Sequence, residues 1–262
     1  MNGYFAFLGK ETMENLRTKK LLVLGCVFLF FAISSPLLGR FMGEFLAMLM
    51  PADDELGQAM IAVMSDPTWT DSFAQFYNNM SQIGTIAVIL VFMGTILREK
   101  RSGSIDLVFT KGLSPGAFVL SKFTVAAIVI TIVNLAAILV CYFYTQVLFD
   151  EIGQISYVIL GGLIFNIFLL LLLALTMFCS ALAKSTATSA VLSLMVFFVI
   201  IFASALPTVG RYLPGTFGLQ DALSITLGEI PQDLIIALVV AFAFIVVSLW
   251  GAIYLSATRQ AN

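Results

Sequence analysis

The sequence IGQISYVILGGLIFNIFLLLLLALTMFCSALA, residues 152–183, runs for 32 residues without a charged side chain. A helix needs about 20 apolar residues to cross the roughly 30 Å hydrocarbon core of a bilayer, so this stretch is long enough to span a membrane. Five further uncharged stretches of at least 19 residues lie at 21–39, 72–97, 123–149, 185–210 and 234–258. The pattern predicts an all-α polytopic membrane protein with six transmembrane helices, whose two ends lie on the same side.

The composition of the chain fits this class. Hydrophobic residues make up 60% of the 262 residues and charged residues only 11%, and the mean hydropathy is +1.04. Soluble domains carry about 25% charged residues. The sequence has no basic patch suited to nucleic acid, and its three cysteines all lie in apolar stretches, which argues against a disulfide framework. We therefore expect a single transmembrane domain over residues 1–262.

The charged residues between the uncharged stretches sort by sign. If the N-terminus is cytoplasmic, 11 of the 13 Lys and Arg residues fall inside, and only Arg40 and Arg211 fall outside. The opposite orientation would place most basic residues outside, against the positive-inside rule. The sequence thus predicts a multi-pass protein of the plasma or inner membrane with both termini in the cytoplasm.

Residues 1–20 have the pattern of an amphipathic helix that precedes the first span. Lys10, Glu14 and Arg17 share one face at 100° per residue, with Phe7 out of place among them, while the opposite face is apolar. Such a helix lies in the headgroup plane with its apolar face in lipid. The alternative is a cytoplasmic extension of the first span.

Two segments toward the predicted outer side are marked by proline and glycine. Pro36 predicts a kink or an end of the first span, followed by a separate short helix over residues 41–50. Residues 207–233 contain three prolines and four glycines, and they are too broken to cross the membrane yet too apolar for a free loop. Irregular backbone at membrane depth is tolerated where it packs against protein. We expect one or two short helices there that dip into the outer leaflet as a re-entrant segment.

The longest predicted cytoplasmic loop covers residues 98–122 and begins REKRSGSIDLVFTKGLSP. A short helix is expected over residues 105–110, because turn-forming residues stand on both sides, at Gly103 and in the sequence GLSP at 112–115. The loop between spans four and five is much shorter, and Lys184 is its charged residue.

The sequence lacks the residues that most enzymes and ion-coupled carriers need. It has no histidine, the usual general base and the commonest metal ligand. It has no Gly-x-x-x-x-Gly-Lys-Ser/Thr loop, so it offers no ATP site of the P-loop kind. Asp, Glu, Lys and Arg are missing from the interiors of the spans, where ion-coupled carriers place them. We expect neither a catalytic site nor a metal site in this chain.

Uncharged polar residues inside the spans are few. Their default role is hydrogen bonding between helices, and the other role open to them is to line a transport path. The candidates for path lining are Gln82, Thr85, Ser189 and Ser193.

Several motifs occur together in one order along the chain. Residues 10–22 read KETMENLRTKKLL, residues 66–84 read DPTWTDSFAQFYNNMSQIG, and residues 212–215 read YLPG. Glu99 is followed by Gly103, Thr110 and Lys111, and then by Lys122. In this order the motifs resemble the elbow helix, the entry to span two, the outer re-entrant segment and the glutamate/glycine-threonine loop of ABC-2 family permeases, the transmembrane subunits of ABC transporters.

The resemblance implies partners that supply the missing ATP site. Such permeases work with separate ATPase subunits, which bind ATP and Mg²⁺, typically as two permeases plus two ATPases. The loop 98–122 would then hold a coupling helix that docks on the ATPase. The residues expected at this contact are Glu99, Lys100, Arg101, Gly103, Leu107, Phe109, Thr110 and Lys111. The elbow helix would carry Lys10, Glu14 and Arg17.

The expected function is that of a membrane subunit of an ATP-driven exporter. Its cargo would move between two permease copies, with spans two and five as walls and the outer re-entrant segment as a gate. Walls without charge favour an amphipathic peptide or another apolar cargo. The alternatives are a membrane immunity or sensing component that transports nothing, an ion-coupled carrier and, least favoured by the residues present, an intramembrane enzyme.

Overall fold

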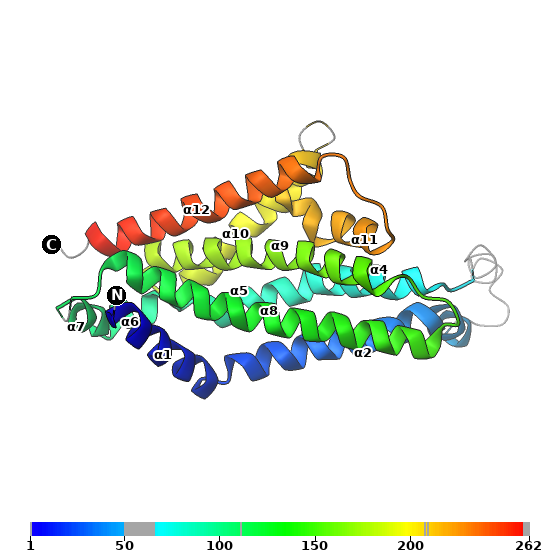
Figure 1. Cartoon of the computed structure of the whole chain (residues 1–262), viewed down its shortest axis with the longest axis horizontal. Coiled ribbons are helices and arrows are strands. Elements are labelled where there is room, and N and C mark those ends of the chain that lie inside the picture. Colours follow the sequence, from blue (N-terminus) through cyan, green and yellow to red (C-terminus); the bar gives the residue numbers. More distant parts are fainter. Residues whose placement is uncertain (1, 50–65, 111, 207, 209, 259–262) are drawn as a thin grey trace.

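The computed structural model describes residues 2–49, 66–110, 112–206, 208 and 210–258, and the regular structure in these residues is helical (Figure 1). The helices in chain order are α1 (Asn2–Arg17), α2 (Lys20–Leu49), α4 (Trp69–Asn79), η1 (Met80–Gly84), α5 (Thr85–Phe92), α6 (Leu97–Arg101), α7 (Ser104–Thr110), α8 (Pro115–Leu148), α9 (Ile155–Leu182), α10 (Thr186–Ser204), η2 (Gly210–Tyr212), η3 (Pro214–Gly218), α11 (Gln220–Thr226) and α12 (Leu234–Thr258). The segment η1 is a π-helix, and η2 and η3 are 3₁₀-helices.

Six segments of the described chain are long and apolar enough to cross a membrane, which confirms the predicted number of spans. Helices α2, α8, α9, α10 and α12 each supply one, and the composite segment Trp69–Arg101 supplies span two. In Figure 1, α1, α6 and α7 lie at the same end of the bundle as the last turns of α12. We call this the inner end, in line with the predicted orientation.

Helix α9 forms the centre of the bundle. It contacts α5, α8, α10, α11 and α12, and Figure 1 shows it running between α8 and α10. Its sequence is apolar on every side, the pattern of a helix surrounded by protein or lipid. Phe165, Phe168 and Leu172 are among its many fully buried side chains.

The first span differs from the prediction at its outer half. Helix α2 continues through Pro36 to Leu49, so the expectation that the first span ends near Pro36 is wrong, and residues 41–49 are part of α2 rather than of a separate helix. A proline inside a membrane helix is tolerated where neighbouring groups and packing compensate for the lost hydrogen bond. Here α2 is held against α4: Asn79 donates a hydrogen bond to Ser35 Oγ over 3.1 Å, and Gly39 lies against the backbone of Ser72.

The short helix of the inner loop forms where the sequence predicts it. Gly103 has φ +69° and Gly112 has φ +87°, and α7 occupies the residues between them. Glycine adopts positive φ without the steric cost that other residues meet. The two glycines therefore fix where α7 begins and ends, and they set it apart from α6 and α8.

The described part of the segment between spans five and six folds as three short helices, η2, η3 and α11, where the sequence led us to expect one or two. It packs back on the bundle rather than extending from it: α11 and η3 contact α9. Tyr77 and Thr226 share a hydrogen bond of 3.0 Å, and Ser81 Oγ donates to the carbonyl of Gly218 over 2.9 Å. The segment is thus tied to spans two and four.

Candidate functional site

The inner end of the bundle contains a buried network of ion pairs that joins three elements. Lys122, in the second turn of α8, lies 2.9 Å from Glu11 of α1 and 2.7 Å from Glu99 of α6. The Lys122 side chain is 2% exposed, and those of Glu11 and Glu99 are 3% and 11% exposed. A buried ammonium needs opposite charge and hydrogen bonds to offset its lost hydration, and the two carboxylates supply both.

Lys10 extends this network toward solvent. Its ammonium lies 3.1 Å from Glu99, 3.3 Å from Glu11 and 3.4 Å from Glu14. Burial by itself would lower the pKa of Lys10, but the hydrogen bond and charge of Glu99, with the charges of Glu11 and Glu14, raise this pKa above its usual value. Lys10 and Glu14, which the sequence places on one face of α1, are therefore ion-paired within a larger network.

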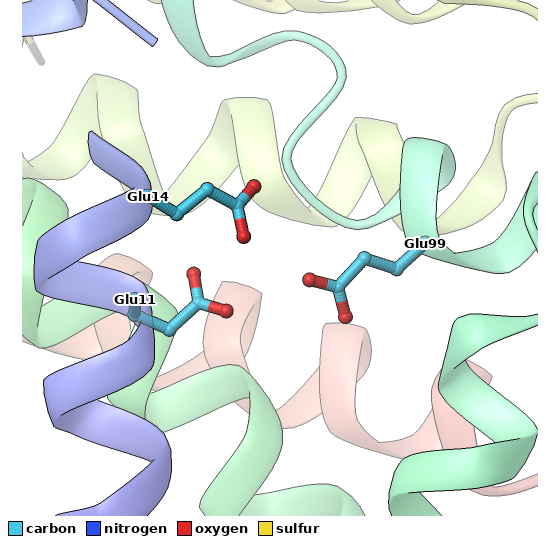
Figure 2. A group of neighbouring side chains, drawn as sticks. All are labelled: Glu11, Glu14 and Glu99. Carbon is cyan, nitrogen blue, oxygen red and sulfur yellow. The ribbon is translucent and has the colours of Figure 1, made fainter. Parts of the chain in front are cut away.

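Figure 2 shows Glu11 and Glu14 of α1 directed toward Glu99 of α6. One carboxylate oxygen from each of the three lies within 4.8 Å of the others. Carboxylates grouped in this way are the ligands that hard divalent cations prefer. Here the ammonium groups of Lys10 and Lys122 already lie among them. The group is therefore an ion-pair network that fastens α1 to the inner loop.

Two basic residues of α6 bind the end of span four. Lys100 Nζ donates to the carbonyl of Ala181 over 2.6 Å, and Arg101 Nη2 donates to the carbonyl of Lys184 over 2.6 Å. The last carbonyls of a helix lack partners within the helix and attract cations. Helix α9 ends at Leu182, so Lys100 satisfies a carbonyl of its last turn, while Arg101 binds the loop that follows it. Together the two side chains tie the two inner loops to each other.

Helix α7, the predicted coupling helix, rests on the first turn of α8. The rings of Phe109 and Phe118 meet edge to face at 5.7 Å, and Phe118 also contacts Phe7 of α1. Phe7 is buried, which explains its off-pattern place on the polar face of α1: that face packs on the protein. Arg17 and Thr110 are exposed, and Lys111 and the side chain of Leu107 lie outside the described residues.

The structure thus gathers most of the predicted ATPase-contact residues in one place, but it gives several of them internal partners. Glu99 is almost fully buried, and Lys100 and Phe109 are half-buried. The ionic partners of Glu99 are Lys10 and Lys122, which lie 89 and 23 positions away in the sequence, so the network is visible only in the fold. The one sequence signal was that Glu99 and Lys122 both belong to the same family motif.

A pocket of about 460 Å³ lies between span two, span five and the outer segment. Its polar lining consists of Asn78, Ser81, Gln82, Ser204, Thr216 and Gln220. Its apolar lining includes Ile86, Phe197, Phe198 and Ile201. None of the described residues that line it is charged. The π-helix η1 forms one wall, and such irregular turns are frequent at functional sites.

The four predicted path residues divide into two groups. Gln82 lines the pocket, is exposed and donates to Asn78 Oδ1 over 2.7 Å. Thr85, Ser189 and Ser193 are buried between helices, where their hydroxyls donate to backbone carbonyls. Sequence reasoning did not single out Asn78, near the outer end of the stretch 72–97, or Gln220, in the broken outer segment.

Comparison with known proteins agrees with this arrangement. Residues 5–220 match the model of the ABC-2 family transporter proteins. The chain is also similar to the uncharacterized transmembrane protein YxlG of Bacillus subtilis (strain 168), with 21% identity over 151 residues. That match covers 58% of this chain and 57% of YxlG, so little more than half of the relative is matched. Because the family match extends over most of the six-span bundle, the chain belongs to the ABC-2 family of transporter proteins, as a membrane-spanning permease component.

Proposed function

We propose that this permease is the membrane subunit of an ATP-driven exporter that moves an amphipathic peptide, or another largely apolar cargo, out of a bacterial cell. The observation that carries the proposal is the uncharged pocket between spans two and five and the outer segment. It lies where a path along spans two and five would meet an outer gate.

The chemistry of the pocket favours such a cargo. Phe197, Phe198 and Ile201 offer apolar surface, while the side-chain amides of Asn78 and Gln82 offer hydrogen-bond donors and acceptors. A charged group would lose hydration here without an opposite charge in return. A peptide with apolar side chains and a polar backbone matches both kinds of lining.

The energy for transport would come from a partner chain. Membership of the ABC-2 family implies an ABC ATPase partner, and we propose two ATPase copies, which bind ATP and Mg²⁺, together with a second permease copy. The inner end of each permease would contact its ATPase through α7 and its flanking residues. Glu99, Lys100 and Phe109 would act there mainly as positioning residues, because their side chains bind α8, α9 and α1.

The proposal is tested with the permease and the P-loop ATPase that co-purifies with it, reconstituted in inverted vesicles with a fluorescent amphipathic peptide as the probe. We expect uptake that requires ATP and that falls in Gln82→Ala and Phe198→Ala variants. Gln146→Ala is the matched control, because Gln146 is exposed on α8, away from the pocket. Uptake without any ATPase that collapses with the proton gradient would instead identify an ion-coupled carrier.

A further inference from the structure

Span two is interrupted near its inner end. Helix α5 ends at Phe92 and α6 begins at Leu97, with turns between them. Such a break in a membrane helix leaves backbone N–H and C=O groups without their usual partners, and water is scarce at this depth. The break therefore persists only where neighbouring elements supply hydrogen bonds.

Two serines from neighbouring spans supply these bonds. Ser180 Oγ of α9 accepts the backbone N–H groups of Ile96 and Leu97, over 3.3 and 3.2 Å. Ser189 Oγ of α10 donates to the carbonyl of Met93 over 2.7 Å. Both serines are 0% exposed. One serine thus holds the inner side of the break to span four, and the other holds the membrane side to span five.

The two contacts differ in what they connect. Ser180 holds the first residues of α6, where Lys100 also binds the end of α9, so α6 is fixed to span four at two points. Ser189 of α10 binds the carbonyl of Met93, at the end of α5, and so joins that end to span five. The two sides of the break are therefore anchored to different spans, the inner side to span four and the membrane side to span five.

We propose that the break at residues 93–96 is a hinge, and that Ser180 and Ser189 are the positioning residues that transmit motion of the inner loop to span five. This proposal rests on the proposed function, since it takes the ATPase as the source of the motion. It goes beyond that function by assigning the transmission to two hydroxyl groups, neither of which faces the ATPase or the cargo pocket.

The first experiment examines the contacts in the purified permease alone. Hydrogen exchange of the Ile96 and Leu97 amides is measured in wild-type protein, Ser180→Ala and Ser180→Thr. We expect exchange at least about fivefold faster in Ser180→Ala, because one acceptor serves both amides, and near wild-type exchange in Ser180→Thr. The control is Thr176→Val, since the buried Thr176 hydroxyl donates only within α9, to Leu172.

The second experiment measures motion in the permease–ATPase complex. Spin labels are placed at the exposed positions Leu182→Cys on α9 and Val191→Cys on α10, in a Cys26→Ser background. Addition of ATP is expected to change the distance between the labels in the wild type and in Ser189→Thr. In Ser189→Ala we expect the change to shrink to less than about half, because the hydroxyl that links the two spans is gone.

The outcomes separate this proposal from the proposed function. Unchanged amide exchange in Ser180→Ala, or equal changes in Thr176→Val, overturns the hinge even if the complex transports cargo. The proposed transmission is overturned if ATP does not change the distance between the labels in the wild-type complex. It is also overturned if the change in Ser189→Ala is as large as in the wild type. If no ATPase co-purifies, the proposed function fails, while the amide exchange still tests the serine contacts.

Discussion

At the residue scale, the role of Lys122 becomes clear only from its neighbours in the fold. In the sequence it is one basic residue at the start of an apolar stretch, where the positive-inside rule accounts for it. In the fold its ammonium is buried between Glu11 and Glu99, which lie 111 and 23 positions away in the sequence. Its charge therefore holds α1 and α6 to α8.

Removal of this one charge is expected to be costly. Lys122→Met leaves two carboxylates buried without their common partner, and breaking a buried ion pair costs about 3–5 kcal/mol. Thermal unfolding of the detergent-purified permease should show a large loss of stability. The matched control is Lys10→Met in the same network, whose side chain is 48% exposed, and it should lose far less. Equal losses in both variants would contradict the assigned burial.

Asp221, in the first turn of α11, is a partly buried carboxyl of the outer segment. Burial raises the pKa of this carboxyl, although a hydrogen bond of 2.6 Å from Thr216 works in the opposite direction. A raised pKa in the fold means that ionisation of Asp221 costs stability as the pH rises through this pKa.

Asp221→Asn is therefore expected to be more stable than the wild type at pH 7. Asparagine keeps a side-chain oxygen that accepts from Thr216, and it carries no charge. The difference should vanish at pH values where Asp221 is protonated. Thermal unfolding measured from pH 4 to pH 8 gives the comparison; a stability gap that widens toward low pH would have the wrong sign.

At the element scale, the fold depends on close contacts between helices, and no pattern in the sequence predicts these contacts. Gly161 of α9 lies against α11: a Cβ atom there would collide with the Thr226 hydroxyl and the Ala222 carbonyl. Helix α11 is too short to hold the outer segment in place without packing against another helix. The missing side chain at Gly161 lets α11 lie directly on span four, where Tyr77 reaches Thr226.

Gly161→Ala is expected to displace α11 and to cost about 1–3 kcal/mol, as overpacking of a tight contact does. Unfolding of the purified permease and protease sensitivity of the outer segment are the measurements. Gly116→Ala in the first turn of α8 is the control, because a Cβ at Gly116 meets no other atom within 4 Å. A stable Gly161→Ala variant with a protected outer segment would contradict this packing.

At the scale of the whole molecule, the start of α1, the last turns of α12 and α7 lie at one end of the bundle, and the outer segment lies toward the other (Figure 1). The charge distribution predicts that the first of these ends is cytoplasmic. Single cysteines in a Cys26→Ser background test this orientation with a membrane-impermeant thiol reagent.

We expect Thr110→Cys to be labelled only in inverted vesicles and Glu229→Cys only in right-side-out cells, since both positions are exposed at opposite ends of the fold. Labelling of Thr110→Cys from the outside of intact cells would reverse the orientation, and with it the proposed contact with an ATPase.

The six spans, the helix between Gly103 and Gly112 and the broken outer segment follow from the sequence alone. Apolar stretches of bilayer length have few alternatives to helix, and turn residues mark where helices stop. The same reasoning failed at Pro36, because it weighs the residue and not the packing around it. For Ser189 the sequence left two roles open, a hydrogen bond between helices or the lining of a path, and in the fold its hydroxyl donates to the backbone of span two.

The sequence by itself therefore determined which segments cross the membrane, since hydropathy and turn signals act over a few neighbouring residues. The tertiary structure alone decided the pairing of Lys122 with Glu11 and Glu99, the serine contacts at the break in span two, and the pocket beside the outer segment. These contacts depend on groups that are distant in the chain and come together only when the helices pack, so local sequence patterns do not predict them.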